Sequence, residues 1–271
     1  MAILRNSQLS GKVGNLRYTR YGNHTVVSEL PTLNNPQTIA QMRGRLRLNN
    51  ILQMYKLLKD CLCRNFQGCN DGRKVYAAFR SQNMKLTPVW LSGADSQFAG
   101  CFIVAPYIVS DGNLETVNVS VTQSGFVSDI QIGALNISDA TTVKDLSMAI
   151  LSEANDWKDG DELHLLILSQ SFVACGEGRV PRVFLKSQEI TIGHDDHLLN
   201  SGSMRWMNDG GCLGISCEGM SEKVVGVAFV HRRMKGKKIL VSRQALVLND
   251  NTLLDAYSGD DAFRECLSFL K

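Results

Sequence analysis

The sequence predicts an α+β protein that is mainly β. A basic N-terminal hairpin and a long helix precede an antiparallel β-rich body with one inserted helix and a C-terminal helix. From Pro88 onward, apolar residues recur with a period of two and turn residues interrupt them every eight to twelve positions, which is typical of a β-sandwich or barrel. Helical periodicity, by contrast, is restricted to a few segments. The composition, with 44% hydrophobic residues, 23 Gly and 5 Pro in 271 residues, is typical of a turn-rich globular chain.

Charge is distributed unevenly along the chain. The first 90 residues carry 14 Lys and Arg and 3 acidic residues, a net charge of +11, whereas the other 181 carry 15 and 23, a net charge of −8. We therefore expect a basic hairpin-and-helix arm over 1–87 and an acidic β-rich body over 88–271, which could divide into lobes at 88–199 and 203–271. A basic arm seeks an acidic partner, either nucleic acid or another protein subunit.

Two short N-terminal segments, 12–20 and 25–30, are rich in β-branched and aromatic residues and predict a hairpin. Gly22-Asn23 supplies the positive φ angles of a tight turn between them, and Pro31 ends the second strand. The candidate contact residues on this hairpin are Lys12, Arg17, Tyr18 and Arg20. Interleaved Arg and Tyr suit phosphate contact and base stacking, but they are also typical of protein interfaces, and we favour a protein partner.

Asn35-Pro36 begins the clearest predicted helix, because Asn is a good N-cap and Pro is favoured at the first helical position. The helix extends to about Phe66 and carries an apolar stripe, which predicts that one face is buried. The stripe consists of Ile39, Met42, Leu46, Tyr55, Leu58 and Leu62. A shorter helix over 74–83 folds back on the first after a turn at 70–72.

Three arginines, Arg43, Arg45 and Arg47, occupy every second position of the long helix. On a helix this spacing places them on more than one side, so they cannot form a single recognition face. A solvated basic collar is the simpler interpretation, and a helix that contacts DNA is the alternative.

The body contains six strand candidates, at 101–109, 115–122, 163–169, 182–192, 224–232 and 237–248. Lys235-Gly236 predicts a tight hairpin turn between the last two. The tip around this turn, 231–238, is strongly basic within an acidic body. A solvated tip is the simpler interpretation, and an anion or subunit contact through Arg232 and Arg233 is the functional one.

Capping patterns predict the helices of the body. Thr142 with Asp145 forms a capping-box variant and predicts an inserted helix over 142–157. Ser258 with Asp261 repeats the pattern and predicts a C-terminal helix.

No segment has the residue pattern that a reaction requires. Cys61, Cys63 and Cys69 form C-x-C-x5-C without a fourth ligand nearby, so we expect no metal, and the state of these thiols stays open. The polar turn 194–197 has unsuitable ligand spacing, and the Gly-rich segment 210–214 lacks the Lys-Ser/Thr ending of a phosphate loop. We expect no catalytic residue, metal or cofactor, and therefore a protein that is not an enzyme.

The N-terminal residues lack the apolar stretch of a secretory signal, and no apolar run approaches the ~18 residues that span a bilayer. We therefore expect no membrane contact, and either a cytoplasmic location or a place in a particle assembled in a cytoplasm.

Scattered motifs carry a resemblance, strongest in 11–15 (GKVGN), 20–22 (RYG) and 35–45 (NPQTIAQMRGR), with further pieces in 105–114 and 230–244. They resemble the domain-of-unknown-function family 6266 of Bacteroidetes and their phages or prophages. The resemblance covers most of the chain in pieces and brings no reaction or catalytic residue with it. It implies a bacterial or phage origin, a protein that is not secreted and an Ig-like β-sandwich within the body.

We therefore expect a non-enzymatic structural or assembly protein that docks through its basic arm within a larger particle, such as a bacteriophage virion. Its partners would be protein subunits, including other copies of the same chain. The alternative is a nucleic-acid-binding protein that uses Arg17, Arg20 and the three helix arginines. The remaining hypothesis is an enzyme that uses Cys212, Cys217 and His231.

Overall fold

The computed structural model describes residues 2–5, 8–21, 24–30, 38–91, 102–153, 156–175, 178–200, 204–217 and 224–268. The fold is α+β and mainly β, with antiparallel sheets, as predicted. The chain divides into two compact units, Met1–Gln41 and Met42–Lys271. This boundary differs from the expected one at 87–88, because the two N-terminal helices contribute to the core of the second unit.

The N-terminal unit is a four-stranded antiparallel sheet in chain order, formed by β1 (Ala2–Arg5), β2 (Gln8–Val13), β3 (Leu16–Tyr21) and β4 (His24–Glu29). The predicted hairpin is present as β3 and β4, but the predicted strand 12–20 is interrupted at Gly14. Gly14 has φ +58° and Val13 pairs with Leu16, so Gly14-Asn15 forms a two-residue turn. Gly22-Asn23, Pro31 and Asn35-Pro36, which carried sequence predictions, lie outside the described residues.

Helix α1 (Ile39–Leu58) is shorter than predicted and is followed by turns over 59–64, where Arg64 has φ +72°. The predicted apolar stripe is buried at Leu46, Leu58 and Leu62, whereas Ile39 is 63% exposed. Helix α2 (Gly72–Asn83) begins after the predicted turn, where the Asp71 carboxylate accepts hydrogen bonds from the first backbone N–H groups of the helix.

The central sheet of the second unit has the strand order β13-β12-β8-β9, and β15 also pairs with β12. Its strands are β8 (Glu162–Cys175), β9 (Gly178–Thr191), β12 (Val224–Lys235), β13 (Lys238–Val241) and β15 (Val247–Leu248). Because β12 pairs with β8 along nine residues of each, the strands on both sides of 200–203 form one sheet. The hairpin turn between β12 and β13 is where the sequence placed it, with Gly236 at φ +63°.

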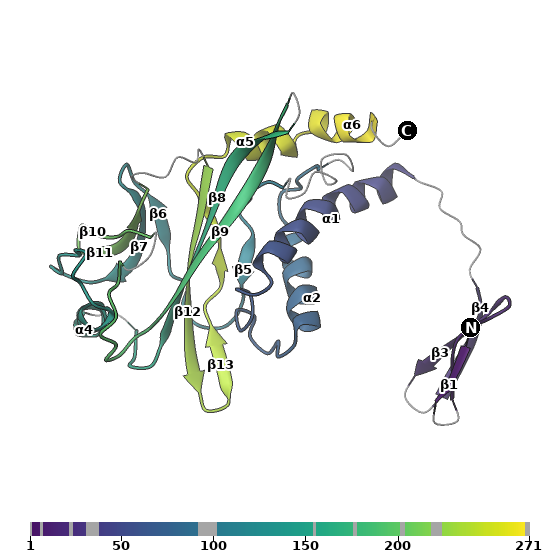
Figure 1. The fold of residues 1–271 in the computed structure, drawn as a ribbon, viewed down its shortest axis with the longest axis horizontal. Helices are drawn as coiled ribbons and strands as arrows, with labels where there is room; N and C mark the ends of the chain where they lie inside the picture. The colour runs from purple at the N-terminus through teal and green to yellow at the C-terminus, as the bar shows by residue number, and fades with distance from the viewer. Residues whose placement is uncertain are drawn as a thin grey trace. The chain divides into compact units, whose positions relative to one another are not determined.

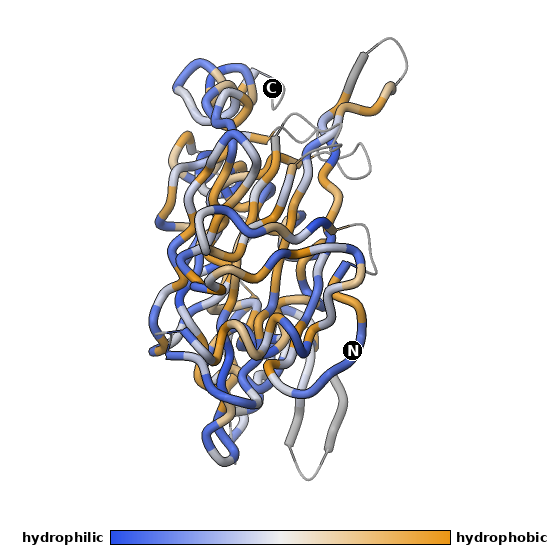
Figure 2. Tube along the Cα trace, turned by 90° about the vertical axis from the view of Figure 1, so that its left-hand side faces the viewer, coloured by the Kyte–Doolittle hydropathy of each residue, from blue (hydrophilic) through white to orange (hydrophobic). Residues whose placement is uncertain are grey.

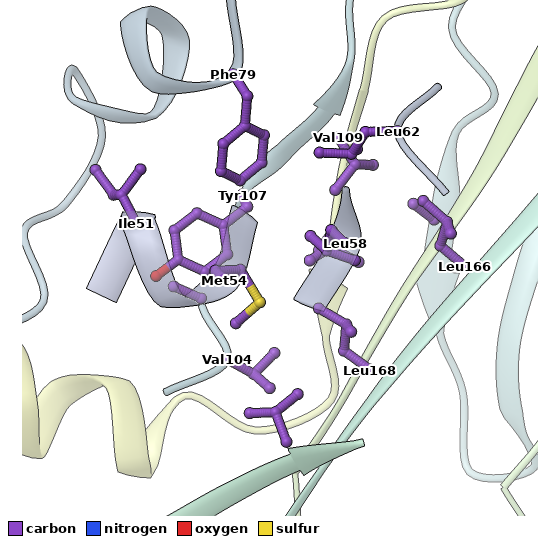
Figure 3. Close-up of a cluster of buried hydrophobic side chains, with 14 of the residues drawn as sticks. Ile51, Met54, Leu58, Leu62, Phe79, Val104, Tyr107, Val109, Leu166 and Leu168 are labelled. Carbon is purple, nitrogen blue, oxygen red and sulfur yellow. The ribbon is translucent and has the colours of Figure 1, made fainter. Parts of the chain in front are cut away.

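Both faces of the central sheet are covered along β8 and β12, which explains the nearly continuous apolar sequence of these two strands. Even-numbered residues such as Leu166 and Leu168 join the core formed with α1 and α2, as Figure 3 shows around Met54 and Leu58. Odd-numbered residues of the same strand, such as Leu165, join a second core on the opposite face. Figure 1 shows β8, β9 and β12 between the two helices and the other sheet. In Figure 2 apolar and hydrophilic stretches alternate along the trace.

The second sheet of this unit has the order β10-β11-β7-β6 and consists of β6 (Val119–Val121), β7 (Gly125–Gln131), β10 (Trp206–Asp209) and β11 (Cys212–Ser216). Beside it lies α4 (Val143–Ser152), with the predicted capping box between Thr142 and Asp145. The sequence prediction missed β7, β10 and β11. Within the Gly-rich segment 210–214, only Gly210-Gly211 forms a turn, and the following residues belong to β11.

Two other predictions for the body are corrected. The described part of the segment 101–109, namely 102–109, contributes only the start of β5 (Ile108–Ser110), which pairs with β14 (Gln244–Ala245). Ser258 does not cap a helix: it ends α5 (Thr252–Ser258) and its hydroxyl donates to the Asp255 carbonyl, while α6 (Asp260–Ser268) begins two residues later. None of the helices in the described ranges is both long and apolar enough to cross a membrane.

Candidate functional site

One face of the N-terminal sheet is richer in apolar side chains, although Glu29 pairs with Leu16 on that face and the exposed Val26 lies on the other. The cross-strand pairs Val13–Leu16 and Tyr18–Val27 place four largely apolar side chains on one face. Among them Val13 is 50% exposed, Leu16 39% and Val27 51%. Among the described residues of this unit, no helix or second sheet forms another layer over that face. A β-sheet with one apolar face requires such a layer, so the face is a candidate docking surface.

The basic residues of this sheet divide between its two faces. Lys12 pairs with Arg17 and Arg17 with Ser28, which places the two cations together on the polar face. Tyr18 is half-buried on the apolar face, and Arg20, which is exposed, pairs with Thr25 at the end of that face. The four predicted contact residues therefore form two different surfaces.

The three helix arginines have different surroundings. Arg43 lies over the Phe263 ring at 4.6 Å from its centroid and 3.9 Å from the Asp260 carboxylate. Arg47 is half-buried and donates a hydrogen bond to the Leu86 carbonyl, whereas Arg45 is exposed. All three belong to the second unit, and the side chains of Arg43 and Arg47 contact other segments of that unit.

Arg232 is not at a solvated tip, because only 1% of it is exposed. It lies on the even-numbered face of β12, next to the turns that follow α1. Its Nε donates to Asn65 Oδ1 at 2.9 Å and its Nη1 to Glu189 Oε1 at 2.9 Å. Its Nη1 also lies 3.4 Å from Glu162, and its Nη2 contacts His164 Nδ1. The guanidinium is thus used within the chain and does not reach a partner surface.

This arrangement changes the titration of the neighbouring side chains. Burial, reinforced by the charge of Arg232, lowers the pKa of His164 to about 4, so the imidazole is neutral at pH 7 and accepts from the guanidinium. Burial raises the pKa of Glu189, but the hydrogen bond and charge of Arg232 outweigh burial and lower it overall. The cluster therefore has a permanent cation with a carboxylate and a neutral acceptor around it.

His231 and Arg233, the neighbours of Arg232 on β12, lie on the opposite face of the sheet. His231 Nε2 lies 2.8 Å from Asp161 Oδ2, and Arg233 donates to both oxygens of the same carboxylate at 2.9 and 2.8 Å. Burial raises the pKa of Asp161, but these hydrogen bonds outweigh it and bring the pKa to about 2. Arg233 also pairs with Asp156 at 3.2 Å. Both predicted arginines of the hairpin are therefore structural, and the exposed tip consists of residues 234–238.

Sequence reasoning did not find the partners of these two clusters. Asp161 lies in the charged segment 158–162, Asn65 follows Arg64 and His164 lies in an apolar strand. The contacting residues of these clusters come from parts of the chain up to 167 residues apart. The only sequence signal is a lone polar residue in a buried strand, His164 between Leu163 and Leu165.

The other candidate chemical sites do not assemble. Within the described ranges, no three His, Cys, Asp or Glu side chains form a group that could hold a metal ion. Cys63 is exposed and Cys61 and Cys69 are partly buried, all as free thiols. His231, the proposed base for a thiol enzyme, has its Nε2 occupied by Asp161.

Comparisons with family models, with curated proteins and with solved structures find no match to this chain.

Proposed function

We propose that this protein is a non-enzymatic structural or assembly protein that docks onto a neighbouring protein subunit through its N-terminal sheet. The observation that carries the proposal is the apolar face of Val13, Leu16 and Val27, which is exposed on a separate compact unit. The family resemblance supports a particle such as a bacteriophage virion as the setting, and an Ig-like description of the body belongs to the same proposal.

The charges favour a second copy of the chain as the docking partner. The N-terminal unit has four basic and one acidic residue, a net charge of +3, so the other 25 basic and 25 acidic residues cancel within the second unit. The strong contrast between the first 90 residues and the rest is thus largely internal to the second unit. The net charge that can attract another subunit is therefore the positive charge of the N-terminal sheet.

The second unit offers a surface of matching chemistry at α4. Met148 is 52% exposed, Leu151 41% and Leu198 47%, and Leu198 bridges to Thr142 at the start of the helix. The segments 139–153 and 195–198, which carry these side chains, also contain Asp139, Asp145, Glu153, Asp195 and Asp196, and Lys144 pairs with Asp196 at 3.7 Å. An apolar patch with acidic surroundings suits a basic sheet with an apolar face. Such a contact joins different surfaces of two copies and therefore builds rings or open chains of subunits.

Association of the full chain, measured by light scattering over a range of concentrations, tests the proposal. We expect assembly that weakens by about tenfold or more in the Leu16→Glu/Val27→Glu variant and in the Met148→Glu/Leu151→Glu variant. The matched control is Phe172→Glu, which changes an apolar side chain with 40% exposure on β8. A monomer at every concentration, or equal weakening by the control, overturns docking between copies.

Nucleic-acid binding is the second candidate, favoured by the adjacent cations Lys12 and Arg17 on the polar face. It makes a different prediction, because Lys12→Gln/Arg17→Gln would abolish binding to duplex DNA while Leu16→Glu/Val27→Glu would not. Two phosphate contacts give a slope of about −2 for log affinity against log salt. Salt-dependent DNA binding by a chain that does not self-associate would replace the first proposal with the second.

A further inference from the structure

A pocket of about 990 Å³ lies between the α1–α2 connection and the tip of the β12–β13 hairpin. Its size is at the upper end of the range for small-molecule sites. It combines two sequence features that the proposed function does not use, namely the cysteine cluster and the basic hairpin tip. Two of the cysteines, Cys63 and Cys69, line it.

The inner wall of this pocket is apolar and aromatic. Phe66 and Val75 are 3% and 4% exposed and belong to the core between the helices and the central sheet. Tyr55 and Ile239 are partly buried against the same core. Tyr55 also packs against the Tyr76 ring at 4.9 Å between centroids. A ligand in this pocket therefore meets a hydrophobic surface on its inner side.

The outer wall is cationic. Lys59, Lys237 and Lys238 line the pocket and are exposed, and no ion pair of theirs occurs among the described residues. Arg64 also lines it, but its guanidinium is held by Glu162 at 2.7 Å. The two acidic lining residues do not cancel the excess, because Asp60 and Asp71 face four basic ones. Asp71 is moreover engaged as the N-cap of α2.

Hydrogen bonds fix the loop that forms the pocket. Tyr55 Oη donates to the Gly72 carbonyl at 3.0 Å, which joins α1 to the start of α2. The Gln67 N–H donates to the Asp111 carbonyl at 2.9 Å, and Gln67 Oε1 accepts from the Asn113 N–H at 3.0 Å. The walls are thus tied to the core on several sides, as expected of a largely preformed site.

We propose that this pocket binds an amphipathic anion, a small molecule with an apolar or aromatic body and one phosphate, carboxylate or sulfonate group. The body would contact Phe66, Val75 and Tyr55, and the acidic group would lie near the three lysines. Binding at this site is independent of docking through the N-terminal sheet.

Titration of the full chain with the aromatic sulfonate 8-anilinonaphthalene-1-sulfonate tests the proposal, because the fluorescence of this probe rises in apolar surroundings. We expect one saturable site whose affinity falls about tenfold in Lys237→Gln/Lys238→Gln, since charge-assisted contacts are lost. Lys235→Gln, on the same hairpin but outside the lining, is the matched control and should bind like the wild type. Phenyl phosphate should compete better than either inorganic phosphate or phenol, because each of these lacks half of the required chemistry.

Alkylation of Cys63 gives a second measurement that does not depend on any variant. Bound probe should slow the modification of Cys63, located by mass spectrometry, and leave Cys212 on the other sheet unaffected. Unchanged affinity in the double lysine variant, or no protection of Cys63 at saturating probe, would overturn the proposal. Equal competition by inorganic phosphate would also overturn it, because the pocket would then be a simple anion site.

Discussion

The Trp157 ring stacks on the imidazole of His231, with ring centroids 3.8 Å apart and planes inclined by 22°. Nε2 of the same imidazole reaches the carboxylate of Asp161, of which only 2% is exposed. Arg233 completes the cluster with two hydrogen bonds to that carboxylate. One buried acidic group thus connects the start of β8 to two residues of β12.

Replacement of this carboxylate should strongly destabilise the second unit. Asp161→Asn removes the buried charged partner of the Arg233 guanidinium and leaves it only the exposed Asp156, and we expect a loss of about 3 kcal/mol or more in the free energy of unfolding. Asp156→Asn is the control, because Asp156 also pairs with Arg233 but its side chain is 63% exposed, and its loss should be below about 1 kcal/mol. Urea unfolding followed by circular dichroism measures both. Equal effects of the two substitutions would contradict a structural role for the buried pair.

Stability should also depend on pH through His164. Its pKa is about 4 in the folded protein and about 6.5 in an unfolded chain. Between these values the unfolded chain binds a proton that the folded one does not, so stability falls as pH decreases from 6.5 to 4 and is constant for this group below 4. We expect a loss of about 3 kcal/mol over the whole window, of which about 2 kcal/mol falls between pH 7 and pH 5. Urea unfolding at pH 7 and pH 5 checks it.

The control for this pH effect is a pair of histidine substitutions. His164→Gln should remove most of the dependence between pH 6.5 and 4, whereas His197→Gln, at an 88% exposed side chain, should leave it unchanged. A pH profile that is the same in all three proteins would show that His164 is not the titrating group. The Asp161 carboxylate acts in a separate window, from about pH 4 down to its folded pKa of about 2, in which stability falls as this group is protonated.

The buried guanidinium of Arg232 should be needed for stability although it does not reach a partner. Arg232→Met preserves much of the volume but leaves Glu189 and the Asn65 carbonyl oxygen without the Arg232 donor, while Glu162 keeps Arg64, and we expect a loss of about 3 kcal/mol. Arg64→Met removes another partner of Glu162, but the Arg64 side chain is 38% exposed, so we expect a change below about 1 kcal/mol. Thermal unfolding compares the two. A gain in stability on Arg232→Met would instead show that desolvation of this cation outweighs its contacts.

Helix α1 should behave as part of the core and not as a mobile arm. Leu58→Ala removes a side chain with 0% exposure from the core beside the central sheet, and a loss of about 2–5 kcal/mol is expected. Ile39→Ala, at a 63% exposed position of the same helix, should change the free energy of unfolding by less than about 0.5 kcal/mol. Urea unfolding of both variants provides the comparison, and a small effect of Leu58→Ala would place α1 outside the cooperative unit.

Local signals predicted the elements that depend on local chemistry. The capping box at Thr142, the turn at Gly236 and the turn at 70–72 before α2 follow from backbone geometry that a few adjacent residues determine. The turn at Gly14-Asn15 had the same kind of signal and was overlooked, so the four-stranded sheet was predicted as a hairpin. The missed strands β10 and β11 have only four and five residues, too few to show a period.

The clusters around Arg232 and Arg233 could not be predicted in this way. Their members come from four separate segments and meet only when β8 and β12 pair in one particular alignment. Charge alone suggested a solvated tip, because Arg232 and Arg233 adjoin the exposed lysines in sequence. Burial in a sheet that is covered on both faces is a property of the tertiary structure. It makes Arg232 and Arg233 structural residues of the second unit, where the sequence alone suggested solvated ones.

The alternation of His231, Arg232 and Arg233 across β12 also affects how faithfully the chain folds. If β12 paired with β8 displaced by one residue, every side chain of β12 would exchange faces. The Arg232 cation would then enter the layer that holds Phe229, and His231 would lose Asp161. The valines and the alanine of β12 fit either face of the sheet almost equally well. The two charge clusters on adjacent residues do not, and they therefore destabilise a misaligned pairing of this strand.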